Sequence, residues 1–280
     1  MSELLIVGGL TIDHFTDGHS APGGSVLHAG LAAVQEGVTP TFLAVAGDEP
    51  EARDGLVRLA ALGDLIHQPA PATTTYRHEE KAGRRVLVFE AATASIDPAV
   101  GRRAGVPHVA LFAPIAAELS AAAVEELRHD LRPERTVLLV QGWLRRLEIG
   151  SPVLPLPLDA VASDLWATFA TADAIVVSTE DLAEAPENPF AQAAALRTRI
   201  GPGPILVLTL GPAGYLLDDP GTDRLLATMP RRVVEGVPSV GAGDTFGAAL
   251  AIHLSRGADA ATAAEAATER VIRVLEARRS

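Results

Sequence analysis

The chain has 280 residues, which corresponds to about two domains at a norm of ~150 residues and also fits one large α/β domain. Its net charge of −12, from 35 acidic and 23 basic residues, argues against binding to the phosphate backbone of a nucleic acid. Cysteine is absent, which excludes disulfides, thiolate nucleophiles and metal sites with cysteine ligands.

The N-terminal segment lacks the basic start of an export signal and reaches Asp13 early, so we expect a first strand and a cytoplasmic protein. Two long charge-free windows, residues 18–35 and 200–217, contain glycines and prolines that break a membrane helix. We therefore expect a small-molecule substrate as the partner, with no nucleic acid and no membrane.

Short β-rich apolar runs alternate along the chain with alanine-rich segments of helical length. The alternation predicts these strand and helix pairs: Leu4–Leu10 with Ser25–Gly37, Pro40–Ala46 with Glu51–Leu62, His108–Phe112 with Ala117–Leu131, Arg135–Val140 with Leu158–Ala170, and Ala174–Val177 with Asn188–Ile200. Three closely spaced strands follow, and then two helices: Pro204–Thr209, Gly214–Leu217, Arg224–Ala227, 243–256 and 259–277. The order predicts an α/β fold with a mostly parallel sheet, helices on its faces and antiparallel strands at one end.

Two further β-like segments, Thr73–Glu79 and Arg84–Ala91, lie around an Ala-Gly turn and predict a small hairpin outside the main sheet. The segment between the first strand and the first helix should project beside it. We expect both to cover the carboxyl edge of the sheet, where open α/β sheets bind ligands. The whole chain is thus predicted as a single domain of residues 1–280, with lid segments near 12–22 and 73–91.

The segment Val237–His253 places a Gly-Ala-Gly turn directly before Asp244 and an apolar-faced helix. Free N–H groups at a helix start, together with the positive end of the helix dipole, suit a phosphate. Asp244 then lies beside such an anion site. The alternative is that Asp244 is simply the N-cap of the helix.

A second glycine turn, TLGPAG at Thr209–Gly214, follows a predicted strand and is either a nucleotide-contacting loop or an ordinary β-turn. The chain has no Gly-Lys-Ser/Thr motif and no Gly-x-Gly-x-x-Gly after its first strand. Classical P-loop and dinucleotide-binding folds are therefore excluded.

Five segments resemble, in order and spacing, the ribokinase-like sugar kinases of the phosphofructokinase-B family: IVGGLTID, PGGSVLHAGLAA, AVAGDE, TLGPAG and VGAGDTFGAAL. The resemblance extends over nearly the whole chain, and GAGDTFGAAL is close to the C-terminal signature of the family. It implies a ribokinase-like three-layer sandwich. It also implies transfer of the γ-phosphoryl group of ATP, with Mg²⁺, to a hydroxyl of a small polyol.

The resemblance also assigns site residues, and the chemistry agrees, because phosphoryl transfer needs positioning, charge stabilisation and a carboxylate near the attacking hydroxyl. Asp244 matches the catalytic base of the family. The other matches are the anion-hole amides of Gly241, Ala242 and Gly243, the ATP loop at Thr209, Gly211 and Gly214, and the acceptor positions Asp13, Gly23 and Gly24.

Two segments depart from the family pattern. Its Asn-x-x-Glu segment, which organises hydrated magnesium, aligns with Ser178 to Asp181. Ser178 keeps an oxygen at the donor site, and Glu180 and Asp181 are candidates for a water-mediated Mg²⁺ role, with a helix N-cap as an equal alternative. His28 replaces an asparagine common in the sugar sites of the family, and is either an acceptor contact or a structural histidine.

The segment QGWLR, Gln141–Arg145, resembles a branch of the family that includes myo-inositol kinases, although Leu139 stands where that branch has an aspartate. Gln141 can exchange hydrogen bonds with a hydroxyl, and the guanidinium of Arg145 suits a phosphate. We therefore include both in the acceptor site. In the alternative interpretation, Arg145 and Arg146 form a solvated surface pair and Trp143 only packs.

The sequence thus predicts a kinase for a sugar or a cyclitol such as inositol. A nucleoside kinase of the same fold is the nearest alternative, although aromatic residues for a base slot are few, at 4% of the chain. A non-catalytic ligand-binding regulator of the same fold is the alternative from another class. A homodimer and a monomer are both left as alternatives, because the predicted lid hairpin is short for dimerisation through the lid.

Overall fold

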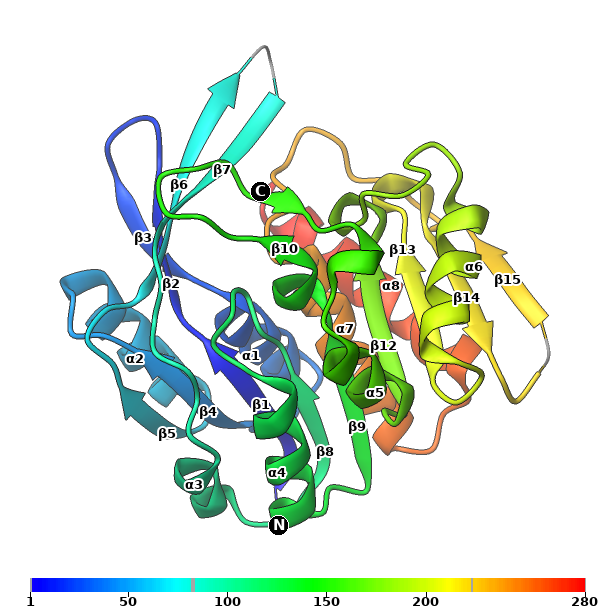
Figure 1. Ribbon diagram of the computed structural model, residues 1–280, viewed down its shortest axis with the longest axis horizontal. Coiled ribbons are helices and arrows are strands. Elements are labelled where there is room, and N and C mark those ends of the chain that lie inside the picture. Colours follow the sequence, from blue (N-terminus) through cyan, green and yellow to red (C-terminus); the bar gives the residue numbers. More distant parts are fainter. Residues whose placement is uncertain (1, 82–83, 223, 280) are drawn as a thin grey trace.

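The computed structural model describes residues 2–81, 84–222 and 224–279, and its middle layer is a nine-stranded sheet (Figure 1). The order of the strands is β15-β14-β13-β12-β9-β8-β1-β4-β5. Their bounds are β1 (Ser2–Gly9), β4 (Thr41–Ala46), β5 (Asp64–Pro69), β8 (Pro107–Phe112), β9 (Arg135–Leu139), β12 (Ala174–Ser178), β13 (Ile205–Thr209), β14 (Tyr215–Asp219) and β15 (Arg224–Thr228).

The strands from β5 to β13 are parallel, and β14 and β15 add antiparallel pairs at one end, as predicted. Alternate residues of β1 enter two different cores: Leu4 and Ile6 pack on one face of the sheet, and Leu5 and Val7 pack on the other. A sheet buried on both faces in this way explains why the parallel strands read as continuous apolar runs.

Helices cover both faces of the sheet. Those on the first face are α1 (Ser25–Gln35), α2 (Pro50–Leu62), α7 (Ala242–Ser255) and α8 (Ala260–Ala277). Those on the second face are α4 (Ala121–Leu131), α5 (Ser163–Ala170) and α6 (Pro189–Ile200), with the short α3 (Pro98–Gly101) beside them. This arrangement confirms the predicted three-layer α/β fold. Within the described ranges, no helix has both the length and the apolar character needed to cross a bilayer.

A separate four-stranded sheet, the lid, stands at the carboxyl end of β1 (Figure 1). Its order is β3-β2-β6-β7, with bounds β2 (Thr11–His14), β3 (Ser20–Gly23), β6 (Thr74–Lys81) and β7 (Arg84–Ala91). Parallel pairing of β2 with β6 joins the two predicted lid segments into one sheet, a pairing that was not predicted. The predicted Ala-Gly turn at 82–83 lies outside the described residues.

Two helix predictions were too long, and one strand of the main sheet was missed. The predicted helix Ala117–Leu131 begins only at Ala121, after Ser120, whose side chain accepts a hydrogen bond from the amide of Ala123. The predicted helix Leu158–Ala170 divides into a 3₁₀ turn and α5. β5 is an edge strand with the mixed sequence DLIHQP, which lacks a β-like apolar pattern.

The remaining short elements lie in the connections. They are the pair β10 (Arg145–Arg146) and β11 (Leu154–Pro155), and the 3₁₀ turns η1 (Arg102–Ala104), η2 (Gln141–Leu144), η3 (Leu158–Ala160), η4 (Thr179–Asp181) and η5 (Gly211–Ala213).

A buried carboxylate shapes the connection between β8 and α4. Glu118 is 2% exposed and accepts hydrogen bonds from the backbone amides of Gly9, Ile115 and Ala116 at 2.8–3.0 Å. Burial raises the pKa of Glu118, and the backbone hydrogen bonds oppose that rise. The side chain therefore ties this connection to the end of β1, where the lid begins.

Candidate active site

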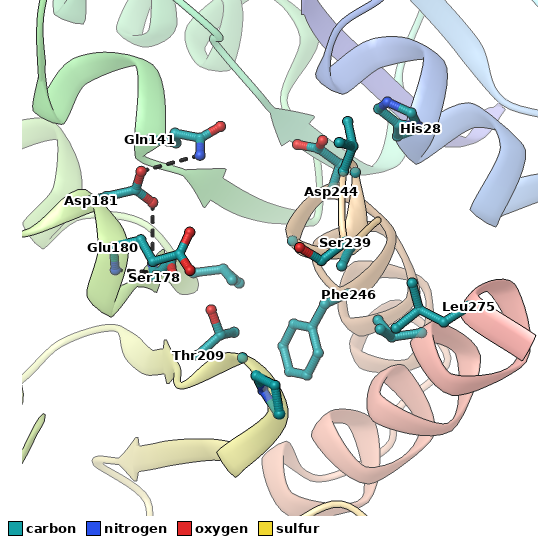
Figure 2. A pocket seen from close by; sticks show the side chains of 18 of the residues that line it. His28, Gln141, Ser178, Glu180, Asp181, Thr209, Ser239, Asp244, Phe246 and Leu275 are labelled. Atoms are coloured by element: carbon teal, nitrogen blue, oxygen red, sulfur yellow. Dashed lines mark hydrogen bonds between the residues drawn. The ribbon is translucent and has the colours of Figure 1, made fainter. Parts of the chain in front are cut away.

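A cavity of about 950 Å³ lies at the carboxyl edge of the sheet, between the lid and the helices α7 and α8 (Figure 2). This is the edge at which open α/β sheets bind ligands. Every site residue predicted from the sequence lines the cavity except Gly23. Segments from six separate stretches of the chain thus meet around one space.

Asp244 lies in the first turn of α7, at the wall of the cavity. The N-cap of α7 is Gly241, in the left-handed conformation with φ 75°, so the alternative that Asp244 is the cap is wrong. Within the described part of the chain, the carboxylate of Asp244 makes no hydrogen bond or ion pair. It is half-buried and available to a ligand.

Gly241 and Gly243 line the cavity but differ in their surroundings. A Cβ atom on Gly241 would lie 2.3 Å from Cγ of His28, whereas a Cβ atom on Gly243 would meet nothing within 4 Å. The backbone at Gly243 is therefore open to a ligand at the helix start, whereas the amide of Ala242, which was predicted as part of the anion hole, already donates to the carbonyl of Ser239 at 3.0 Å. This geometry suits an anion.

His28, on α1, is half-buried with its imidazole against the backbone of Gly241. Figure 2 shows it across from Asp244, at the side of the cavity where α1 approaches the start of α7. No hydrogen bond to its ring occurs among the described residues. The ring therefore packs, as the structural alternative requires, and it also lines the cavity.

The predicted ATP loop follows β13, with Thr209 at the strand end and Gly214 after η5. Thr209 Oγ1 donates to the carbonyl of Val177 at 3.3 Å. Gly214 has φ 101°, and a Cβ atom there would lie 1.9 Å from the carbonyl oxygen of Thr228, so the close approach of β15 already requires glycine. Gly211 also has a positive φ of 57° and lines the cavity.

Opposite this loop, apolar side chains of α7 and α8 form a wall that the sequence did not single out. Phe246, Val271 and Leu275 line the cavity there, and Figure 2 shows Phe246 and Leu275 on the helices that face Thr209. The apolar residues of α8 gave no separate signal in the sequence, because the same apolar pattern also describes a helix that packs on a core.

The segment from Ser178 to Asp181 forms a capping box at η4, as its N-cap alternative predicted. Ser178 Oγ accepts from the amide of Glu180 at 3.2 Å, and Asp181 Oδ2 accepts from the amide of Ser178 at 3.4 Å. Asp181 is buried, whereas Glu180 is exposed, and both line the cavity. Of the two, Glu180 has the carboxylate that is open to solvent and to a hydrated ion.

Asp181 is also contacted by the QGWLR segment. Gln141 Nε2 donates to Asp181 Oδ1 at 3.1 Å, and Arg145 Nη2 lies 3.9 Å from the same oxygen. Burial raises the pKa of Asp181, and the guanidinium of Arg145 and the hydrogen bond from Gln141 oppose the rise. Among the described residues, no group of three or more histidine, cysteine or acidic side chains could hold a metal ion.

The interpretation of Arg145 as part of a solvated surface pair is wrong, because its side chain is only 13% exposed. Its Nη1 donates to the carbonyl of Ile115 at 3.4 Å. Trp143 does pack, with its ring 5.4 Å from that of Phe169 and its Nε1 donating to the carbonyl of Leu119 at 2.5 Å. Arg145 thus presents a nearly buried guanidinium to the cavity.

Asp13 lies on β2 of the lid, and its side chain is 15% exposed. Asp13 Oδ1 accepts from Nε2 of His78 at 2.9 Å. A Cβ atom on Gly23 would lie 2.3 Å from Asp13 Oδ2, so glycine at this position leaves room for the carboxylate. Gly24, with φ 100°, is the N-cap of α1.

Sequence reasoning missed two lid residues that line the cavity, Tyr76 and His78. The signal was their two-residue spacing on a predicted strand, which places both on one face. Tyr76 Oη donates to the carbonyl of Ile115 at 2.8 Å, and burial raises the pKa of Tyr76.

Residues 133–269 match the pfkB family of carbohydrate kinases, and no curated protein matches the chain. Solved structures give a likeness of the whole fold. A pyrophosphate-dependent kinase of the ribokinase family, complexed with a pyrophosphate analog and myo-inositol, matches with a TM-score of 0.76 at 15% identity, over 95% of this chain and 92% of that chain.

Two other structures show the same fold. The fructokinase from Vibrio cholerae O395 gives a TM-score of 0.70 at 18% identity, over 99% of each chain. The ribokinase from Arabidopsis thaliana complexed with ribose and ATP gives 0.67 at 15% identity, over 98% of this chain and 99% of that chain. The match to the pfkB family of carbohydrate kinases thus spans residues 133–269, and the solved structures show a ribokinase-like fold over the full length of the chain.

Proposed function

We propose that the protein transfers the γ-phosphoryl group of ATP to a hydroxyl of a small polyol, with Mg²⁺. The observation that carries the proposal is the placement of Asp244. Its carboxylate has no partner within the described residues, and it lies in the first turn of a helix whose N-terminus opens onto the cavity. One aspartate beside one anion site is what phosphoryl transfer to a hydroxyl requires.

In this mechanism, Asp244 accepts the proton of the acceptor hydroxyl as its oxygen attacks the terminal phosphorus. The backbone N–H groups of Gly241 and Gly243 stabilise the charge on the transferred phosphoryl group, whereas the N–H group of Ala242 already donates to the carbonyl of Ser239 at 3.0 Å. Arg145 adds a positive charge to the same cavity. The bond between the γ-phosphorus and the β-phosphate oxygen breaks, so that ADP leaves, the phosphoryl group ends on the acceptor and the proton ends on Asp244.

The donor end of the cavity supports a nucleotide. Phe246, Val271 and Leu275 provide an apolar wall that fits a nucleobase, opposite the loop at Thr209 and Gly211. For Mg²⁺, the exposed carboxylate of Glu180 fits an ion that keeps most of its waters and is bound chiefly by phosphates. Bound there, the metal would neutralise charge on the donor phosphates.

The acceptor end supports a compact polyol. Asp13, His28 and Gln141 bring a carboxylate, an imidazole and an amide to the cavity, and all three exchange hydrogen bonds with hydroxyls. The resemblance of QGWLR to the myo-inositol kinases makes a cyclitol our first choice. A free pentose or hexose is the second.

Pyrophosphate is a second candidate for the donor. It is favoured by the nearly buried guanidinium of Arg145 and by the likeness to a pyrophosphate-dependent kinase at a TM-score of 0.76. Pyrophosphate has no apolar group that could contact the wall of α7 and α8, whereas ATP has a nucleobase. ATP is therefore our first choice.

The proposal is tested by supplying ATP or pyrophosphate with Mg²⁺ and a panel of cyclitols, sugars and nucleosides, and by measuring the phosphorylated product. We expect product from ATP with a cyclitol or a sugar, and a rate lower by roughly 10²–10⁴ for the Asp244→Asn variant. Product from nucleosides alone would make the protein a nucleoside kinase. Saturable ATP binding without product from any acceptor or donor would favour the regulatory alternative and overturn the proposal.

A further inference from the structure

Strand β6 of the lid directs two side chains into the cavity. Tyr76 and His78 are two residues apart and therefore share a face of the strand. Arg77, between them, belongs to the other face, where its Nε donates to Glu90 at 2.7 Å. The side chain of His78 is 9% exposed, so the lid places an imidazole in a largely closed environment beside the acceptor end of the cavity.

His78 is held by two contacts from the segment that carries Asp13. Its Nε2 lies 2.9 Å from Asp13 Oδ1, and its ring stacks on Phe15 at a centroid distance of 4.6 Å. The opposite face of Phe15 stacks on His19 at 4.3 Å. The imidazole of His78 therefore has a fixed orientation relative to the carboxylate.

The two oxygens of Asp13 are placed differently. Oδ1 accepts the hydrogen bond from His78, whereas Oδ2 lies 3.4 Å from Thr11 Oγ1, a long contact, and beside the bare backbone of Gly23. Rotation of the Asp13 carboxylate would break the bond to His78. One oxygen is thus fixed by the lid, and the other keeps capacity to accept from a ligand.

Stability alone is a weak reason for such a pair. Replacing a buried pair of charged or polar groups by apolar side chains of similar size is often neutral or stabilising for a fold. A carboxylate that must accept hydrogen bonds from a hydroxylated ligand, in contrast, gains from being held in one orientation before the ligand arrives.

We propose that His78 is a positioning residue for the acceptor: through its hydrogen bond to Asp13 Oδ1 it orients Oδ2 toward the acceptor hydroxyls. The inference rests on the proposed function and deepens it. It assigns a role in acceptor binding to the lid hairpin, which comes from a part of the chain about 65 residues beyond Asp13.

The first test is steady-state kinetics on myo-inositol and fructose as acceptors, with three variants. His78→Leu keeps the bulk and removes the donor, and it should raise the acceptor KM roughly tenfold to a hundredfold, the range for a hydrogen bond to a charged group, with the donor KM within about twofold. His78→Gln keeps an N–H group at a similar reach and should recover most of that loss. His19→Leu is the matched control, since it stacks on the same phenyl ring but pairs with the exposed Asp17.

Equal effects of His78→Leu and His19→Leu would mean that only the aromatic stack matters, and would overturn the proposal. An equal rise in the donor KM would overturn it as well, because a general loosening of the structure would affect both substrates.

A second test does not need turnover. In long-range ¹H–¹⁵N spectra of the histidine rings, Asp13→Asn should shift the Nε2 resonance of His78 and leave that of His19 in place. Unchanged His78 resonances would show that the pair is absent and would overturn the inference. If neither acceptor is phosphorylated but the pair is present, the proposed function is wrong for these two acceptors. The inference is then tested by adding myo-inositol: a shift of the His78 resonance would support it, and an unchanged resonance would overturn it.

Discussion

Gln141 and Asp181 are 40 residues apart in the chain, and the amide of the first donates to the carboxylate of the second at 3.1 Å. The bond joins the segment that follows β9 to the segment that follows β12, which are neighbouring strands of the sheet. Asp181 therefore holds the QGWLR segment in place, and the carboxylate left open to the donor end of the cavity is that of Glu180.

Burial of Asp181 predicts a pH-dependent stability. Because burial raises its pKa in the folded protein, the folded state keeps the proton to a higher pH than the unfolded state does. The stabilising contribution is complete below the pKa of the unfolded chain and is lost as the pH rises through the folded value. The free energy of unfolding of the wild type, relative to Asp181→Asn, should therefore fall with rising pH, by at most about 1.4 kcal/mol per pH unit.

Urea unfolding of both proteins at several values between pH 4 and 8 checks this. Glu49→Gln is a control of opposite sign. Burial would raise the pKa of Glu49, but hydrogen bonds from Thr73 hold it below its usual value. The free energy of unfolding of the wild type, relative to Glu49→Gln, should therefore rise with rising pH. The prediction would be contradicted if the free energies of unfolding of Asp181→Asn and of the wild type had the same dependence on pH.

Asp244→Asn should lower kcat by roughly 10²–10⁴, the range for losing a general base, because an amide cannot accept the proton. The free energy of unfolding should fall by less than about 1 kcal/mol. The reason is that the carboxylate has no hydrogen bond within the described residues and interacts only with the helix dipole. Turnover and thermal unfolding measured on the same preparation decide the matter. Preserved turnover with a large loss of stability would refute the catalytic assignment.

Two glycines of one turn should respond in opposite ways. Gly243→Val places a side chain in open space at the cavity, so the fold should persist while the donor KM rises by an order of magnitude or more. Gly241→Ala places a Cβ against the ring of His28 at a positive φ, and should cost about 1–2 kcal/mol of stability. Chemical unfolding and donor KM, measured for both variants, separate the two effects. A stable Gly243→Val variant with unchanged donor KM would remove this turn from the site.

Glu180→Gln should raise the Mg²⁺ concentration that gives half-maximal activity by roughly tenfold, because it removes the exposed carboxylate at the donor end. Glu187→Gln, an exposed glutamate outside the cavity, is the matched control and should leave this requirement unchanged. The measurement is a magnesium titration at saturating donor and acceptor. Coinciding titrations for the two variants would argue against a role of Glu180 toward the ion.

The layers of the fold could be predicted because parallel strands buried on both faces leave long apolar runs, such as that of β1. The edge strand β5 lacks such a run, so it gave no signal. The joining of β2 to β6 depends on main-chain pairing between segments about 60 residues apart, which periodicity cannot report.

In the candidate site, glycine motifs located the start of α7 and the turn after β13, because close approaches restrict those positions to glycine. His78 carried no such restriction, since a histidine on a hairpin strand has the same pattern whether it faces a ligand or solvent. Its place became visible only with its neighbours, Asp13 and Phe15.

The construction of the lid limits how it could be exchanged between related enzymes. β1 continues into β2 with only Leu10 between them, and Leu10 is fully buried and donates its amide to the carbonyl of Val45. Within the hairpin of β6 and β7, β6 pairs with β2 over residues 74–77. A graft of residues 73–91 alone would therefore carry β6 without its partner β2 and leave β6 with an unpaired edge, a surface that promotes aggregation. The lid is a unit of two insertions, and a chimaera that keeps its shape must carry residues 10–24 together with 73–91.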